Sequence, residues 1–436
     1  MWPTTSRNGR GTWWLIGLAG LLILAVLGGL LAWWAYENDT RVRFRVQELY
    51  GSVRGLVVEQ PVIVPTSVSA AALPTFAPTM TPTPAPSATP QPAAVAFTAT
   101  PAPSPTAIPP SPTPLASEVL LTGFNHEYQL FNNCGPASLA MTLSFWGWEG
   151  TQKTAATVLK PNQDDKNVSP IELYEYAVTQ GYDAYIRNNG DLDTLRRFIA
   201  AGYPVLVEKG FACEPGENCN GWFGHYSVFV GYDDETRTFT LQDSYRGPNL
   251  KMGYDDVMEN WRAFNYLYIV PFPAGETHDA KVRALLGPAV DLDQNYRDSL
   301  ARAEEEARTL TGEQQAMAWF NVGTNLHYMN DYNAAALAYD QAREIGLPYR
   351  MLWYQFGPYR AYYYMGRYQE VVDVATFAID SVNTVAGLEE AYYWRGLSEI
   401  ALGQQDKAVE DFRTALSRHP GWKPAIEALA TLGLQP

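Results

Sequence analysis

A proline-rich tract without a single charged side chain, from Gln60 to Ser117, constrains this 436-residue chain most strongly. It contains 16 of the 31 prolines. Proline lacks a backbone N–H and has a fixed φ, and the tract has too few large apolar residues to bury a core. We therefore predict a disordered, extended spacer rich in Pro, Thr, Ser and Ala. Its composition is typical of O-glycosylated stalks on surface proteins, and an unmodified linker is the simpler alternative.

An apolar segment precedes this linker. No charged residue lies between Gly11 and Tyr36, which exceeds the roughly 20 residues that a helix needs to cross a bilayer. Tryptophan pairs at both ends match the aromatic belts of membrane interfaces. We predict a single transmembrane helix at 13–36, after a short tail at 1–12. A cleaved signal peptide, with a shorter apolar core, is the alternative.

The orientation of this helix does not follow from charge, because basic residues flank it on both sides. A stalk usually faces outward, so we expect the globular parts outside the cytoplasm, tethered to the cell membrane. The juxtamembrane segment 37–59 suggests no function.

Composition excludes several functions for the remainder. The net charge is −15, and no Lys/Arg cluster suits nucleic acid. No phosphate-binding glycine loop is present, so we expect no nucleotide. The three cysteines and five histidines have no zinc-ligand spacing. We therefore predict no metal and no cofactor.

Cys134 lies at the predicted start of a helix, near the beginning of the globular part at residue 118. Asn132 or Asn133 can cap this helix, Pro136 suits its first turn, and Gly147 ends it. A helix N-terminus favours a thiolate. The amide of Gln129 can join the Cys134 N–H in an oxyanion hole. The alternative is a small buried cysteine of no chemical role.

A general base for this thiol is available in His225. This residue lies in an apolar and aromatic run, Gly224–Tyr232, that predicts a buried strand. A turn leads into a partner strand that ends at Asp243. An antiparallel pairing brings His225 and Asp243 to the same end of the hairpin, where the carboxylate can orient the imidazole. A solvated strand-end histidine and loop aspartate are the alternative.

These segments, Gln129, Cys-Gly-Pro-Ala-Ser-Leu-Ala-Met and Gly-His-Tyr-Ser-Val-Phe-Val-Gly-Tyr with the following aspartate, resemble the C-thirty-nine-like peptidases. These are papain-like cysteine peptidases related to those that remove double-glycine leaders from bacteriocins. The resemblance covers residues 118–272, with a closing helix at 254–261 and a strand at 266–270, and implies an α+β papain-like domain at 118–275. It assigns Cys134 as nucleophile, His225 as base, Asp243 as orienter and Gln129 as oxyanion donor.

Two departures from that family are visible. Ser244 follows the aspartate where the family often has proline. No ATP-binding cassette is present, so transport-coupled leader export by this same chain is excluded.

Cys213 and Cys219 lie in a loop between the strand at 204–208 and the His225 strand. A local disulfide would close this loop in an oxidising compartment. Two free thiols are the alternative.

The last third, residues 290–436, repeats with a period of 36–37 residues. Its predicted turns lie at Asn330, Gly366 and Gly403, and small or aliphatic residues recur at fixed distances after them: Ala335, Val371, Ala408, Ala342, Ala378 and Ala415. This pattern resembles tetratricopeptide repeats, whose period is usually 34, and implies an all-α solenoid that binds a protein or peptide. A plain helical bundle is the alternative. The helix at 291–309 would cover one end. Several tyrosines are candidates for the groove, although many are expected to serve packing only: Tyr328, Tyr359, Tyr362, Tyr363, Tyr392 and Tyr393.

The sequence thus predicts a multi-domain, single-pass membrane protein with a cysteine peptidase domain that hydrolyses peptide or protein substrates, and a protein-binding repeat array. Two other functions stay open. The peptidase-like domain could be an inactive peptide-binding scaffold, or it could transfer the acyl group to an amine as a transpeptidase or amidase.

Overall fold

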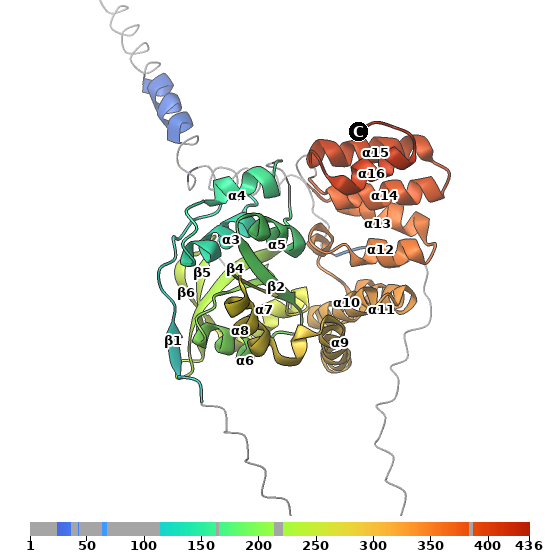
Figure 1. The fold of residues 1–436 in the computed structure, drawn as a ribbon. Helices are drawn as coiled ribbons and strands as arrows, with labels where there is room; N and C mark the ends of the chain where they lie inside the picture. Colours follow the sequence, from blue (N-terminus) through green and yellow to red (C-terminus); the bar gives the residue numbers. More distant parts are fainter. Residues whose placement is uncertain are drawn as a thin grey trace, which may run out of the picture.

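The computed structural model describes residues 24–35, 42, 63–67, 114–162, 165–212, 221–382 and 387–436. They include a sheet domain followed by a helical array (Figure 1). Of the predicted transmembrane segment, only residues 24–35 are described, and they are helical. The described residues include no helix with the length and apolarity of a membrane span. The N-terminal tail, most of 37–59 and most of the linker lie outside the described residues.

The sheet has seven strands in the order β2-β7-β3-β4-β5-β6, with β1 paired to β4, and every pairing is antiparallel. The strands are β1 (Glu118–Leu120), β2 (Tyr182–Arg187), β3 (Val205–Ala212), β4 (Trp222–Asp233), β5 (Thr238–Asp243), β6 (Gly247–Gly253) and β7 (Tyr268–Pro273). The central strands β3 and β4 are buried along almost their whole length. They therefore lack the alternation of apolar and polar residues that marks a strand with one face in water.

Helices cover both faces of this sheet. One face carries α3 (Cys134–Phe145), α4 (Gln152–Leu159) and α5 (Pro170–Thr179), and the other α6 (Leu192–Ala200), α7 (Tyr254–Trp261) and α8 (Glu276–Leu286). Alternate residues of a strand point to opposite faces. Accordingly Leu206 packs with α3 and α5, whereas Val205 and Val207 pack with α6 and α7.

The predicted elements of this domain are largely confirmed. Helix α7 has the predicted bounds, and β4 and β5 form the predicted hairpin. The last strand begins at Tyr268 rather than Tyr266. The reason is local, because Asn265 and Tyr266 have φ of 54° and 56°, a left-handed conformation that ends the short helix η1 (Arg262–Phe264) and is incompatible with a strand.

Two further segments, η2 (Gly287–Val290) and α9 (Leu292–Thr309), lead into the array. The array consists of three successive helix pairs, and a last helix follows them. These helices are α10 (Gly312–Tyr328), α11 (Tyr332–Ile345), η3 (Tyr349–Trp353), α12 (Gly357–Tyr364), α13 (Tyr368–Asp380), α14 (Glu389–Ala401), α15 (Gln405–Arg418) and α16 (Lys423–Thr431).

The predicted repeat positions are confirmed. Asn330, Gly366 and Gly403 all have positive φ and connect the two helices of their pair. The recurring small or aliphatic residues are fully buried: Ala335, Val371, Ala408, Ala342, Ala378 and Ala415. Among the tyrosines, Tyr359 and Tyr362 are completely buried, which agrees with a packing role, whereas Tyr328 is 49% exposed.

The sheet domain and the array meet through buried polar side chains. The Asn325 amide donates to the Asn265 side chain, and the Ser299 hydroxyl donates to the same Asn265 oxygen at 3.0 Å. At the other end of this contact, Arg350 donates to the backbone carbonyl of Trp222 on β4. Because buried amides must keep their partners, these bonds fix how the two parts are joined.

Candidate active site

Helix α3 begins at Cys134, as predicted, and holds this residue at its N-terminus. Residues 135–144 of the helix are all buried, so packing on every side fixes the helix against the sheet. The predicted side-chain cap is wrong, however. Asn133 occupies the N-cap position, but its amide donates to Gln152 Oε1 at 2.8 Å instead of capping the helix.

His225 lies on β4, and its ring is 5% exposed beside Cys134. Its Nε2 is 3.0 Å from Oδ2 of Asp243 at the end of β5. The Cys134 thiol lies close enough to the same ring for each group to shift the pKa of the other. The antiparallel hairpin therefore brings His225 between Cys134 and Asp243, the order that an activated thiol requires.

The carboxylate of Asp243 is completely buried and has hydrogen-bond donors on both oxygens. Its Oδ2 also accepts from the Ser227 hydroxyl at 2.8 Å. Its Oδ1 accepts from the backbone N–H groups of Tyr245 at 3.0 Å and Arg246 at 2.8 Å. Burial alone would raise the pKa of Asp243, but the charge of His225 and these donors hold it well below its usual range. The group is therefore an anion at neutral pH.

The Cys134 thiol and the His225 imidazole shift each other's pKa in opposite directions. Burial alone would raise the pKa of Cys134, yet its hydrogen bond and charge attraction to His225 leave that pKa below its ordinary value. Burial alone would lower the pKa of His225, and Asp243 together with Cys134 raises it to about 9. Both shifts favour the thiolate–imidazolium pair over the neutral thiol and imidazole.

Gln129 is 8% exposed, and its orientation is set by Ser244. The Ser244 hydroxyl donates to Gln129 Oε1 at 2.9 Å, and the Gln129 N–H donates to the Ser244 carbonyl at 2.8 Å. None of the described residues accepts a hydrogen bond from the Gln129 Nε2 group. The serine that departs from the family pattern thus fixes the amide oxygen and leaves its donors for a ligand.

Two charged residues near the thiol were missed at the sequence level. Glu208 and Lys209 on β3 are 3% and 2% exposed. Burial raises the pKa of Glu208 well above its usual range, with the charge of Cys134 adding to this. Burial also lowers the pKa of Lys209, against the effect of Asp243. A charged pair directly after the apolar run Val205-Leu206-Val207 was the available signal.

The array reaches this site through Tyr354, directly after η3. Tyr354 lines, together with Cys134, Glu208 and Tyr226, a crevice of about 10 Å³, close to the minimum for one water. Burial and the charge of Cys134 raise the pKa of Tyr354. A side chain at Gly224 would lie 2.9 Å from its ring. Glycine before His225 therefore makes room for a residue of the array.

A larger cavity adjoins the crevice. It has a volume of about 690 Å³ and is lined by both parts of the protein, including Tyr185 and Asn188 from the sheet domain and Tyr328 and Arg360 from the array. Glu208 and Tyr354 line both spaces. The two spaces therefore share part of their walls, and Cys134 lines the smaller one.

One group of side chains among the described residues has the geometry of metal ligands. Ligand atoms of Asp165, Glu389 and His419 lie within 4.8 Å of one another, where the array meets the sheet domain. His419 Nδ1 is 2.7 Å from Glu389 Oε1. Burial, followed by the charge of Glu389, raises the pKa of Asp165 well above its usual range. Burial and the neighbouring carboxylate of Glu389 thus both disfavour the ionised form of Asp165.

The predicted disulfide cannot be placed, because Cys213 and Cys219 lie outside the described residues. Cys134 is a free cysteine.

Residues 121–269 match the Peptidase C39 like family, and residues 389–420 match a tetratricopeptide repeat. The chain therefore carries a C39-like peptidase-family domain followed by tetratricopeptide repeats, as the sequence motifs indicated. The second match corresponds to the pair α14–α15. No curated protein matches the chain.

Three solved structures illustrate the similarity. A chain described as a C39-like peptidase from Bacillus anthracis is 19% identical, covers 37% of this chain and 100% of its own, and has a TM-score of 0.31. A double glycine motif protease from an AMS/PCAT transporter, in complex with the leader peptide, is 15% identical, with 36% and 99% covered and a TM-score of 0.26. MamA from Desulfovibrio magneticus RS-1 is 14% identical, with 40% and 85% covered and a TM-score of 0.28.

Proposed function

With a C39-like peptidase-family domain as the premise, we propose that the protein is a cysteine peptidase that hydrolyses peptide bonds of a peptide or protein substrate, and that its papain-like site is completed by the repeat array. The observation that carries this proposal is the position of His225, beside Cys134 and hydrogen-bonded through Nε2 to Asp243. A buried histidine in a purely structural role does not need a thiol on one side and a fully satisfied carboxylate on the other.

In the first half-reaction the Cys134 thiolate attacks the carbonyl carbon, and a C–S bond forms. The N–H groups at the α3 N-terminus and the Gln129 amide stabilise the oxyanion. The His225 imidazolium then gives its proton to the leaving amine as the C–N bond breaks, which leaves an acyl-enzyme.

In the second half-reaction water attacks the thioester. Neutral His225 takes a proton from this water, and Cys134 leaves as the thiolate, which restores the starting ion pair. Asp243 keeps Nε2 protonated throughout, so that the other ring nitrogen faces the thiol.

The substrate reaches the thiol along the 690 Å³ cavity between the two parts. The crevice at Cys134 is too small for a peptide carbonyl beside Tyr354, so Tyr354 moves when substrate enters. The repeats thus contribute to substrate selection as well as to partner binding.

We also propose that residues 13–36 anchor the protein in the cell membrane and that the globular parts lie outside the cytoplasm. The charge-free apolar run with tryptophan pairs and the stalk-like linker support this location. Protease added to intact cells should then degrade the globular parts. Protection until the cells are lysed would place them inside.

The peptidase proposal is tested by the reactivity of Cys134 with an alkylating reagent as a function of pH, in the full chain and in His225→Ala. Rapid alkylation near pH 6 that slows in the variant supports an activated thiolate. A thiol that reacts only near pH 8.5, as an isolated cysteine does, and equally in both proteins would contradict the proposal and favour the inactive scaffold.

Turnover distinguishes hydrolysis from acyl transfer. With a peptide library, Cys134→Ala should abolish all cleavage and retain the melting temperature. Mass spectrometry identifies the products, because a hydrolase yields free carboxylates. Products joined to an amine, at the expense of free acids, would identify a transpeptidase or amidase instead.

A further inference from the structure

A short segment of the linker, residues 63–67, lies on the repeat array, although the two are far apart in the sequence. Ile63 forms an antiparallel bridge with Pro348, and the Val64 N–H donates to the Leu347 carbonyl at 2.9 Å. The Val64 side chain is completely buried in the core of the array, whereas Ile63 is 50% exposed. The segment is therefore bound through its backbone and through one apolar side chain.

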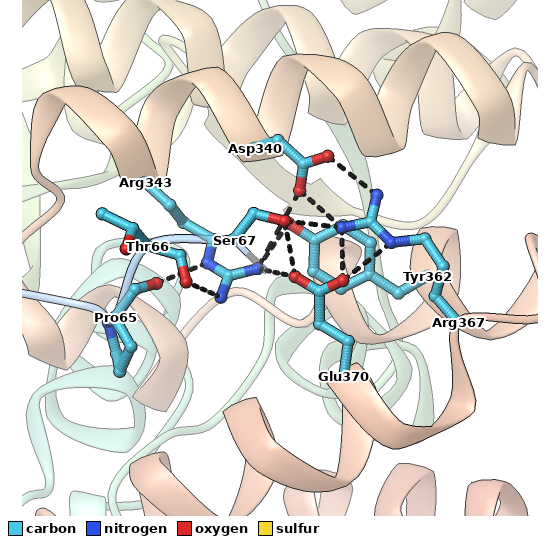
Figure 2. A network of polar contacts seen from close by, with 8 residues as sticks. All are labelled: Pro65, Thr66, Ser67, Asp340, Arg343, Tyr362, Arg367 and Glu370. Atoms are coloured by element: carbon cyan, nitrogen blue, oxygen red, sulfur yellow. Dashed lines mark hydrogen bonds and ion pairs between the residues drawn. The ribbon is translucent and has the colours of Figure 1, made fainter. Parts of the chain in front are cut away.

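Arg343 of α11 binds the backbone of this segment (Figure 2). Its Nε donates to the Pro65 carbonyl at 2.8 Å and its Nη2 to the Thr66 carbonyl at 3.2 Å. Its Nη1 is held by Tyr362 and by Glu370, at 3.0 and 2.7 Å. Because these two contacts come from the array itself, they hold the planar guanidinium in place before the segment binds, and binding costs little side-chain entropy.

Ser67 completes the contact. Its hydroxyl donates to Glu370 Oε1 at 2.7 Å and accepts from Arg367 Nη2 at 2.9 Å. Arg367 is itself held by Asp340, with bonds of 2.8 and 2.7 Å. A hydroxyl both donates and accepts, which suits a position between a carboxylate and a guanidinium.

The core packing of Val64 and the polar side chains around Ser67 together define a site between α11 and α13, here called the linker site. Backbone carbonyls are recognised by Arg343 whatever the side chains, and selectivity comes from the buried valine and the serine hydroxyl. Proline is compatible with position 65, because the site binds the backbone carbonyl of this residue and no N–H group.

We propose that the linker site binds an extended peptide of the type Val-Pro-Thr-Ser and that residues 63–67 of the same chain occupy it. The linker is then fastened to the repeats before it continues to the peptidase domain. This proposal deepens the proposed peptide-binding role of the repeats and does not depend on catalysis.

Thiol labelling in the full chain tests the proposal, in a background with Cys134, Cys213 and Cys219 replaced by serine. Val64→Cys should be alkylated at least about tenfold more slowly than Ile63→Cys, because labelling at position 64 requires the segment to leave its site. Equal rates at the two neighbouring positions would overturn the proposal.

Matched variants identify the contacts. Ser67→Ala in the Val64→Cys protein should raise the labelling rate several-fold, since both bonds to Arg367 and Glu370 are lost while the repeats stay unaltered. Thr66→Ala also removes a hydroxyl, but the structure uses only the Thr66 carbonyl, so the rate should not change. Identical effects of the two variants would rule out the proposed recognition of Ser67.

The occupant is identified by competition and dilution. Excess synthetic peptide of residues 60–70 should accelerate labelling at position 64, and the same peptide with Val64→Asp should not. The rate without peptide should be independent of protein concentration. Slower labelling at higher concentration would show that a second copy supplies the segment, contrary to the proposal. The background lacks Cys134, so the result is separate from any result on the peptidase.

Discussion

At the residue scale, His225 determines how activity should depend on pH. The pKa of Cys134 lies below its ordinary value and that of His225 is raised to about 9, so the ion pair exists between these two values. Activity should rise with pH as Cys134 ionises, below the usual thiol range, and fall as His225 loses its proton near pH 9. The pH profile of kcat/KM should be bell-shaped with its upper limb there.

The variant Asp243→Asn tests whether Asp243 sets the upper limb of this pH profile. It removes the charge that raises the His225 pKa. The backbone N–H groups of Tyr245 and Arg246 would hold the amide oxygen, so the NH2 group would face Nε2, where it cannot accept a hydrogen bond. We expect kcat to fall by roughly 10³- to 10⁴-fold and the upper limb to move to lower pH. An unchanged profile would mean that Asp243 does not orient His225.

Ser244 should affect the rate through Gln129. Ser244→Ala removes the bond that fixes the Gln129 oxygen, so we expect kcat to fall while KM changes little. Gln129→Ala should cost more, about 10²- to 10³-fold, as for other oxyanion donors. In a double variant the two effects should not add. Full additivity in kcat would show that Ser244 acts independently of Gln129.

The residues of the site differ in how far the sequence alone could identify them. Cys134 and His225 follow from local patterns, a helix start and a strand. The dependence of Gln129 on Ser244 and the burial of Glu208 and Lys209 could not be predicted, since both result from contacts between segments far apart in the chain.

At the element scale, the repeats pack through pairs of small and large residues. A side chain at Gly323 would lie 2.7 Å from Tyr339, and one at Gly396 would lie 2.7 Å from Phe412. The middle copy has the same spacing with the sizes exchanged, since Tyr359 precedes Ala375 and both are buried. The exchange explains why this copy lacks the recurring aromatic residue on its second helix.

Gly396→Ala should destabilise the array by about 1–3 kcal/mol, although alanine favours helix formation. The added methyl group would meet the buried ring of Phe412. Thermal unfolding measures the effect. In a Phe412→Leu background the same change should cost clearly less, and an equal cost in both backgrounds would contradict direct contact.

Element boundaries were predictable where a single residue determines them. Gly147, Gly366 and Gly403 have positive φ at the expected turns. The strand that begins at Tyr268 was placed too early, because nothing in the sequence indicates that Asn265 and Tyr266 both adopt a left-handed conformation.

At the scale of the whole molecule, Tyr354 links the repeats to the thiol. Tyr354→Ala should enlarge the crevice and raise the alkylation rate of Cys134, by about tenfold if access limits the reaction. Tyr364→Ala is a suitable control, because that tyrosine is 54% exposed on α12 and lines neither the crevice nor the adjoining cavity. An equal rate in wild type and Tyr354→Ala would mean that the repeats do not restrict access.

The order of the parts along the chain could be predicted, but their mutual placement could not. Tyr354, Asn325 and Arg350 give no sequence signal that they contact the sheet domain. Residues 63–67 are an even clearer case. Their partners lie 277 to 303 positions away, and the sequence of the surrounding tract is not typical of a packed segment.

The binding of residues 63–67 to the repeats changes how far the sheet domain and the array can lie from residues 13–36. If the whole of 37–113 were free, a fully extended connection to the sheet domain would span about 260 Å. Residues 37–62 alone, up to the linker site, would span about 90 Å. If residues 13–36 anchor the protein in the membrane, as proposed, the shorter connection keeps Cys134 close to the membrane surface. Release of residues 63–67 from the linker site would nearly triple the length of this connection, so the distance at which Cys134 can meet a substrate would depend on whether these five residues are bound.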